Sequence, residues 1–185
     1  MEIQFILLRI KNMIISPVSE WKVIKDEERD YQFVIKQFAI PIIVLCGVTK
    51  FLGLFLFEGS FNFFHSLLYA ITHFIAIFAA FYLTSLVVLQ VAPTFAPQTD
   101  RNTSFKFIAY SLIPYFTATL FSNLFSSLYF LKLFYLFSVY LLWQGLEILL
   151  QTPDSKKLGF IAIILLVIFM LILAVQETIL FIIPI

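Results

Sequence analysis

The chain has 185 residues, of which 62% are hydrophobic and 18% aromatic, and its mean hydropathy is +1.01. Soluble domains hold only about 45–50% apolar residues, so this chain has too little polar surface for water and is expected in a lipid bilayer. The net charge of +1 argues against a nucleic-acid partner, and a single cysteine excludes an internal disulfide or a cysteine-built metal site.

Residues 1–36 are predicted to form a cytoplasmic segment at the membrane interface. Six apolar residues recur at helical spacing and define one face of a first short helix: Ile3, Ile6, Leu7, Ile10, Met13 and Ile14. Gln4, Arg9, Lys11 and Asn12 lie largely on the other faces. Such a helix is too short and too charged to cross a bilayer, and it is suited to lie along the surface.

A second short helix is predicted to start at Pro17, with Ser16 as its cap. It carries Trp21, which is expected at the level of the lipid headgroups. The sequence KDEERD at residues 25–30 follows and mixes both signs of charge. It is either a solvated linker or part of a surface that binds a protein partner.

Residues 37–185 are predicted to form a five-helix transmembrane domain, so the expected fold class is an all-α membrane protein. A crossing needs roughly 20 mostly apolar residues, because a helix rises about 1.5 Å per residue through about 30 Å of hydrocarbon. Five segments meet or approach this length: 38–57, 67–91, 105–124, 128–150 and 158–175. Ser104 is a candidate cap for the third segment, and the break before the fourth is short.

Orientation follows from the positions of Lys and Arg. Basic residues precede the first span and occupy the second and fourth connections, whereas the first connection and the carboxyl tail hold none. The positive-inside rule then places the amino terminus in the cytoplasm and the carboxyl terminus on the opposite side.

Three stretches, RIKNMIISPVSEWKVIKDE (9–27), AYSLIPYF (109–116) and YLLWQGLEILLQTPDSKKLGF (140–160), resemble prokaryotic members of the Yip family. These membrane proteins are named for interacting with Ypt/Rab GTPases. The resemblance implies a five-span, non-enzymatic protein, located here in the bacterial cytoplasmic membrane. It draws attention to Tyr110, Ser111 and Pro114 in the third span and to Pro153 in the Thr-Pro link. In eukaryotes the family is tied to membrane trafficking and Rab binding; bacteria have no Rabs.

Ionisable groups at membrane depth are costly and are candidates for function. From the predicted spans, Lys50, His73, Lys132 and Glu177 come to similar levels in the outer half of the bilayer. They either line an outward-facing polar cavity, such as an anion or proton site, or serve structure. In the second case Lys50 and Lys132 extend to the headgroups while His73 bonds a neighbouring helix.

Glu147 lies near the inner end of the fourth span and is expected to pair with Lys36 or Lys106. Gln144, one turn away, extends that network. Pro114 lacks an amide hydrogen and is expected to bend the third span, with Tyr110 or Ser111 satisfying the freed backbone groups. The bend either shapes a pocket or is passive.

A ridge of small residues along the second span, formed by Thr72, Ala76, Ala80 and Thr84, predicts close packing by another helix of this chain or of a second copy. There is no His-Glu-x-x-His pattern, glycine-rich phosphate loop or nucleophile elbow, so no enzyme, metal or cofactor is predicted. The leading hypothesis is a membrane-organising or protein-interaction component that contacts lipid, a protein partner through its amino-terminal segment, or a second copy. The alternative is a small transporter or channel that uses the Pro114 bend with Lys50 and His73.

Overall fold

The computed structural model describes residues 3–57, 62–95 and 99–182, and no β-strand occurs in these ranges. A short amino-terminal pair, α1 (Ile3–Ile15) and α2 (Pro17–Asp26), precedes the long helices. The elements that follow are α3 (Tyr31–Val34), η1 (Ile35–Ala39), α4 (Ile40–Leu52), η2 (Gly53–Phe57), α5 (Phe63–Phe95), α6 (Arg101–Ser111), α7 (Ile113–Leu124), η3 (Ser126–Phe134), α8 (Tyr135–Ile148) and α9 (Asp154–Ile182). The predicted all-α membrane fold is confirmed.

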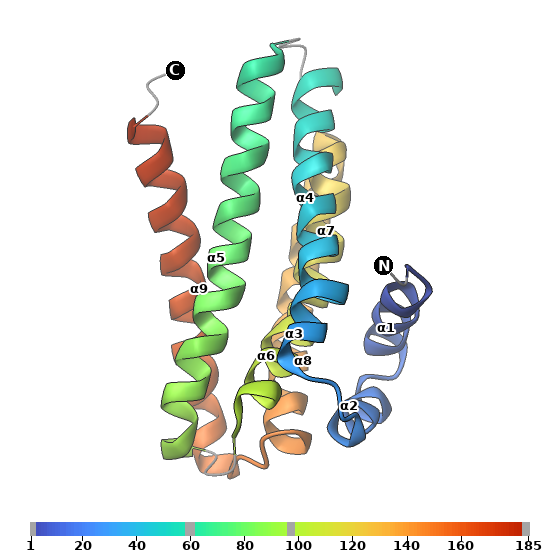
Figure 1. The fold of residues 1–185 in the computed structure, drawn as a ribbon, viewed down its shortest axis with the longest axis vertical. Coiled ribbons are helices and arrows are strands. Elements are labelled where there is room, and N and C mark those ends of the chain that lie inside the picture. Colours follow the sequence, from blue (N-terminus) through green and yellow to red (C-terminus); the bar gives the residue numbers. More distant parts are fainter. Residues whose placement is uncertain (1–2, 58–61, 96–98, 183–185) are drawn as a thin grey trace.

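Within the described ranges, four helical stretches are long and apolar enough to cross a membrane: Tyr31–Phe57, Phe63–Phe95, Ser126–Ile148 and Asp154–Val175. The bent pair of α6 and α7 makes a fifth when it is counted as one span. Figure 1 shows the long helices side by side, with α1 and α2 packed beside their lower half and the end of α9 at the opposite end of the bundle. This arrangement agrees with the five-span plan predicted from the sequence.

Aspartate side chains mark where two of the spans begin. The Asp30 carboxylate accepts a hydrogen bond from the backbone N–H of Phe33 at 2.8 Å, and Asp100 does the same for Thr103 at 2.8 Å. The first and third spans therefore begin earlier than predicted, and Ser104 is not the cap, because its hydroxyl bonds the Asp100 carbonyl at 3.0 Å. Ser16 does precede α2 as expected, but its side chain makes no capping hydrogen bond.

The third span bends by 40° between α6 and α7, as the sequence predicts for Pro114. Leu112, at the break, has φ −84° and ψ 3°, outside the helical region. Pro114 stands in the first turn of α7, where a missing amide hydrogen costs least. Because the third span breaks just before Pro114, the proline lies at the start of a helix and does not interrupt one.

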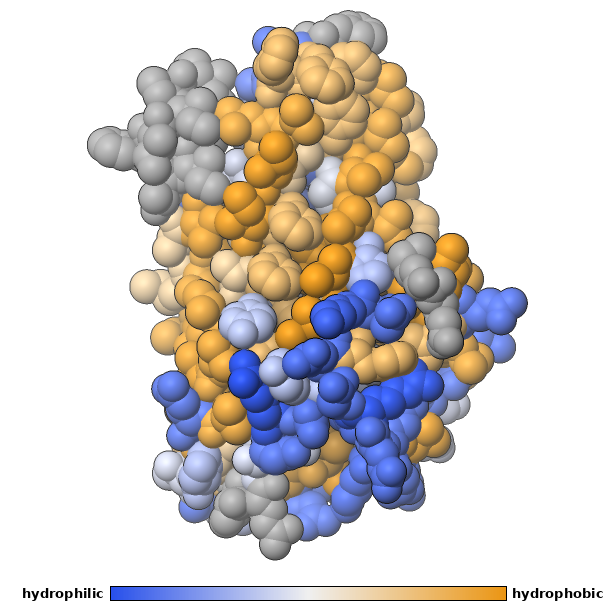
Figure 2. Space-filling view, in the orientation of Figure 1, coloured by the Kyte–Doolittle hydropathy of each residue, from blue (hydrophilic) through white to orange (hydrophobic). Residues whose placement is uncertain are grey.

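Hydrophobic and hydrophilic surface residues gather in different parts of the molecule along its long axis. Figure 2 shows an apolar upper part and a hydrophilic band over the lower part, where α1 and α2 lie. Beneath the surface, Met13 and Trp21 belong to the same buried cluster as Phe38 and Phe107 of the bundle. The predicted division at residues 36 and 37 stays a prediction, although one helix, Tyr31–Phe57, runs through it.

The predicted ridge of small residues on α5 is covered within this chain. Thr72, Ala76, Ala80 and Thr84 are all at most 7% exposed. Small side chains on a membrane helix allow close approach of neighbouring helices, and here those neighbours come from the same bundle. The ridge therefore leaves no surface for a second copy.

Candidate functional site

The amino-terminal helix pair is joined to the bundle by a buried arginine. Arg9 is 3% exposed, and its Nη1 donates a hydrogen bond to Glu20 Oε1 at 2.6 Å. Its Nη2 pairs with the Glu27 carboxylate, and its guanidinium lies 4.9 Å from the ring centroid of Tyr110 on α6. One cation thus connects α1, α2, the segment after α2 and the third span. The sequence analysis placed Arg9 on a polar outer face, so this contact is a correction.

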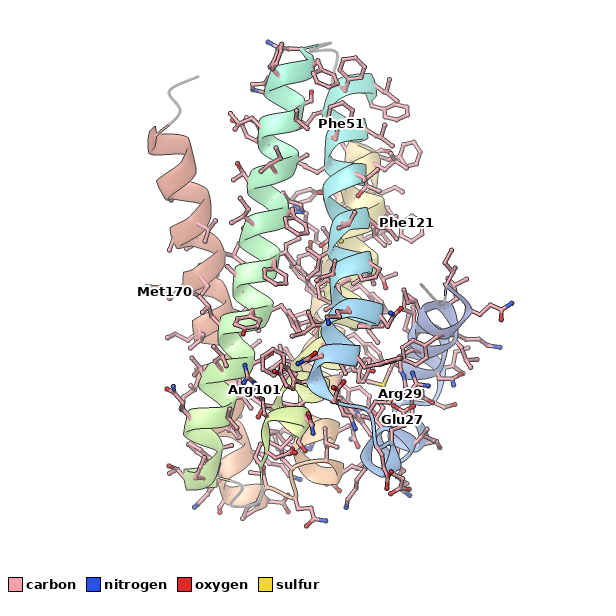
Figure 3. All side chains as sticks on the ribbon, viewed as in Figure 1. Glu27, Arg29, Phe51, Arg101, Phe121 and Met170 are labelled. Atoms are coloured by element: carbon pink, nitrogen blue, oxygen red, sulfur yellow. The ribbon has the colours of Figure 1, made fainter. Side chains whose placement is uncertain are left out.

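Further bonds hold the segment between α2 and α3. Lys106 Nζ donates to the backbone oxygen of Glu27, and the Tyr31 backbone N–H donates to Asn102 Oδ1 at 2.9 Å. Figure 3 shows Glu27 and Arg29 together between the helix pair and the base of the bundle. Part of KDEERD is therefore folded into the protein, and we refer to residues 3–30 as the platform.

Trp21 is fully buried within the protein. Its expected level at the lipid headgroups stays a prediction. Its ring centroid lies 6.1 Å from that of Phe107. Gly145 on α8 makes room for both rings, because a Cβ at this position would come within 2.7 Å of Phe107 and 2.9 Å of Trp21. The glycine inside an apolar span was the sequence signal for this close approach.

The exposed surface of the platform is mixed in character. Lys22, Lys25, Asp26 and Glu28 are exposed charged side chains of α2 and the segment that follows it. Apolar residues of α1 are exposed as well: Ile3 at 56%, Leu7 at 62%, Leu8 at 57% and Ile15 at 67%. The platform therefore offers a charged surface and an apolar one.

A second group of polar residues gathers in the other half of the bundle. A cavity of about 280 Å³, the polar crevice, is lined by Lys50, Tyr69, Thr72, His73, Asn123, Lys132 and Glu177. The four residues that the sequence placed at one level thus share one cavity. His73 also bonds a neighbouring helix, since Asn123 Nδ2 lies 3.0 Å from its Nε2. Asn123, which the sequence analysis did not single out, holds α7 to α4 as well, through a 3.2 Å bond to the Cys46 carbonyl.

An apolar cavity of about 480 Å³ adjoins the polar crevice and shares His73, Asn123 and Lys132 with it. Its walls come mainly from α7, α8 and α9, with Leu112 at the bend of the third span among them. Pro114 itself is buried and does not line either cavity. The bend therefore contributes to the cavity wall through Leu112.

Tyr110 and Ser111 do not satisfy the backbone at the bend. Both hydroxyls are buried and make no hydrogen bond with the residues that the structure describes. The Tyr110 ring packs edge-on against Phe38, with centroids 5.0 Å apart. Other side chains bond the backbone after the bend: the Thr117 hydroxyl donates to the Ile113 carbonyl at 2.8 Å. The expected role of Tyr110 and Ser111 is thus corrected.

No group of three or more His, Cys, Asp or Glu side chains in the described ranges is arranged to hold a metal ion. A family model described as the Yip1 domain matches residues 11–176. The chain belongs to the Yip1 family. Comparisons with curated proteins and with solved structures gave no match. The Yip1 match extends from the platform to α9, and it confirms the resemblance seen in the sequence.

The Thr-Pro link of this Yip1 chain connects α8 to α9 in a compact turn. The backbone N–H of Thr152 donates to the Leu146 carbonyl at 2.8 Å, and Gln151 adopts a positive φ of 52°. Thr152 is 5% exposed, whereas Pro153 is exposed. Pro153 therefore shapes the turn at the surface.

Glu147 does not pair with Lys36 or Lys106. It accepts from Lys157 Nζ at 3.0 Å, and Asp154 approaches the same ammonium at 2.6 Å. The sequence did not indicate Lys157 as the partner, because only the folded Thr-Pro turn brings the start of α9 back beside the end of α8. Gln144 is half-buried and makes no hydrogen bond to Glu147 within the part of the chain that the structure describes, so the network does not extend to it.

Yip1 membership and the apolar helices establish an integral membrane protein. The family is not a known enzyme family, and its members are associated with membranes. Among the described residues, the platform at one end of the bundle and the polar crevice towards the other are candidates for function.

Proposed function

We propose that this protein is a non-catalytic interaction component of the membrane, which presents its platform to a protein partner. The observation that supports this most directly is the buried Arg9 network. It makes residues 3–30 a fixed part of the fold, with Lys22, Lys25, Asp26 and Glu28 on its exposed surface.

A fixed platform favours binding for a physical reason. A surface that is already ordered loses less conformational entropy on association than a flexible linker does. Exposed charges of both signs then favour a partner with the complementary pattern, and they act mainly on specificity and on the rate of encounter. The platform therefore combines an ordered backbone with a pattern of exposed charges that a partner can recognise.

The platform is assigned to the cytoplasmic side by its basic residues. Lys22 and Lys25 belong to the same end of the bundle as Lys156 and Lys157, which start α9 after the fourth connection. The positive-inside rule puts this end in the cytoplasm and the carboxyl terminus outside, in the bacterial cytoplasmic membrane. The exposed apolar residues of α1 would then rest in the inner leaflet, where an amphipathic helix is stable.

Site-specific cross-linking in intact membranes tests this function. A photoreactive residue at Lys22 or Lys25 is expected to capture a defined partner, and Lys22→Glu with Lys25→Glu is expected to abolish capture from a neighbouring position such as Glu28. Both lysines are exposed, so stability should change by only about 0.5 kcal/mol or less. The matched control is a photoreactive residue at Leu133, which is 72% exposed on η3. Equal capture from Leu133 and from the platform contradicts the proposal.

A small transporter or channel is the second candidate, and the polar crevice is the observation that favours it. Lys50 and His73 both line the crevice. If transport is the function, Lys50→Leu with His73→Leu should abolish flux in proteoliposomes while folding is kept. If the platform carries the function, the same variant should keep its partner.

A further inference from the structure

The polar crevice and the apolar cavity lie next to each other, and we refer to the two together as the joined space. Their volumes are about 280 and 480 Å³, and His73, Asn123 and Lys132 belong to both linings. Ligand sites are commonly clefts of about 300–1,000 Å³, mostly apolar, with a few polar groups that set orientation. The joined space has this composition, and the charged side chains among its described lining residues lie at the crevice end.

Two lysines line the polar end. Lys50 and Lys132 share it with the Glu177 carboxylate, among the residues that the structure describes. The Lys132 ammonium lies 4.0 Å from the ring centroid of Tyr129, which compensates part of its charge. Ammonium groups donate strong, charge-assisted hydrogen bonds to phosphate oxygens. Two of them on the wall of one cavity therefore favour an anionic group there.

The bonds of Asn123 determine what His73 can offer an anion. Its amide nitrogen bonds the Cys46 carbonyl, which can only accept, so the nitrogen of this amide is identified by its partner. The second amide hydrogen then points to His73 Nε2, which must accept. The ring proton is consequently on Nδ1, and the imidazole is a neutral hydrogen-bond donor.

The apolar end meets the lipid. Leu165 and Phe169 of α9 line the apolar cavity, and they are also 38% and 63% exposed. The same two side chains thus border both the cavity and the outer surface of the bundle. A hydrocarbon chain can reach the cavity from the bilayer, whereas a free anion would leave the apolar end unfilled.

We propose that the joined space binds one anionic lipid, with its phosphate between Lys50 and Lys132 and a hydrocarbon chain in the apolar cavity. The two lysines attract the phosphate, His73 donates a hydrogen bond to it, and Glu177 opposes its charge. The chain in the apolar cavity distinguishes a lipid from inorganic phosphate.

The test uses the full-length protein in neutral detergent and follows its Tm. Long-chain phosphatidic acid is expected to raise Tm, because a ligand that binds only the folded state stabilises it. Phosphatidylcholine with the same chains, inorganic phosphate and glycerol phosphate are expected to leave Tm unchanged. An equal shift with phosphatidylcholine overturns the charge requirement, and an equal shift with either free phosphate compound overturns the lipid assignment.

Variants localise the effect. Lys50→Gln with Lys132→Gln is expected to weaken phosphatidic acid binding by about tenfold or more, since it removes both charge-assisted hydrogen bonds to the phosphate. If the double variant does not fold, Lys132→Gln alone, on a half-buried residue of η3, is expected to show a smaller loss of the same sign. Glu177→Gln is expected to strengthen binding.

Lys22→Gln with Lys25→Gln is the charge-matched control at the platform. It removes the same amount of positive charge and is expected to keep phosphatidic acid binding within about twofold of the original protein. An equal loss in this control, or weaker binding by Glu177→Gln, overturns the assignment to the crevice.

Discussion

Arg9 Nη1 lies 2.6 Å from Glu20 Oε1, and this ion pair joins the first two helices of the chain where both meet the bundle. The side chains of Arg9 and Glu20 are 3% and 9% exposed, so water stabilises neither charge. A buried ion pair adds little net stability over apolar side chains, but each charge depends on the other remaining in place. The pair therefore acts mainly to specify one position of the platform.

Arg9→Met is expected to destabilise the protein by about 3–5 kcal/mol, because it leaves the Glu20 carboxylate buried without its cation. Denaturant unfolding in detergent measures the loss, and Trp21 fluorescence should shift to the red as the platform detaches from Phe107. Lys11→Met, two residues along the same helix on an exposed position, is the control and should change stability by about 0.5 kcal/mol or less. Equal behaviour of the two variants contradicts the role assigned to Arg9.

Gly145→Ala is expected to destabilise the protein by about 1–3 kcal/mol, the usual cost of adding volume to a packed interior. The added Cβ would stand 2.7 Å from Phe107 and 2.9 Å from Trp21. Gly159→Ala on α9 is the matched control, since nothing lies within 4 Å of a Cβ there. It should be neutral or stabilising by about 0.5–1 kcal/mol, because alanine favours a helix. Phe107→Leu should partly rescue Gly145→Ala, and absence of rescue argues against this contact.

In the upper half of the bundle, Gly53→Ala is expected to lower Tm more than Gly47→Ala does. A Cβ at this position would lie 1.9 Å from the Asn123 carbonyl oxygen, and backbone atoms cannot rotate away as a side chain can. The end of α7 would have to move, and the polar crevice that Asn123 lines would change with it. Gly47→Ala is the comparison, because its nearest neighbour would be 3.5 Å away in ordinary contact. A similar Tm for the two variants would count against the close approach of η2 and α7.

Asn123→Ala is expected to cost about 1 kcal/mol, since hydrogen bonds between membrane helices average about 0.6 kcal/mol and reach about 1.7. It removes two bonds, to the Cys46 carbonyl and to His73. Ser122→Ala is the control on the same helix, because its hydroxyl bonds neither Cys46 nor His73 and lies 3.5 Å from the Thr119 carbonyl of its own helix. The cost should stay well below that of Arg9→Met, where a charge rather than a neutral group is left unpaired. A cost of 3 kcal/mol or more for Asn123→Ala would contradict this ranking.

The sequence by itself determined the fold class, the approximate spans and the bend. Each depends on local information: runs of apolar residues set the spans, turn-forming residues separate them, and Pro114 cannot donate a backbone hydrogen bond. The Yip resemblance was readable for the same reason, because its motifs are short stretches in a fixed order. Helix ends shifted by a few residues, since either Asp100 or Ser104 satisfies the local pattern for a cap.

The sequence also brought Lys50, His73, Lys132 and Glu177 to one level, because depth along a membrane helix follows from counting residues. Counting does not give the rotation of a helix about its axis, and rotation decides which neighbour a side chain meets. The tertiary structure alone decided that Arg9 and Trp21 face inward, that Glu147 meets Lys157, and that Asn123 bridges three helices. Lipid attracts apolar side chains on every side of a helix, so only packing between helices selects the contacts.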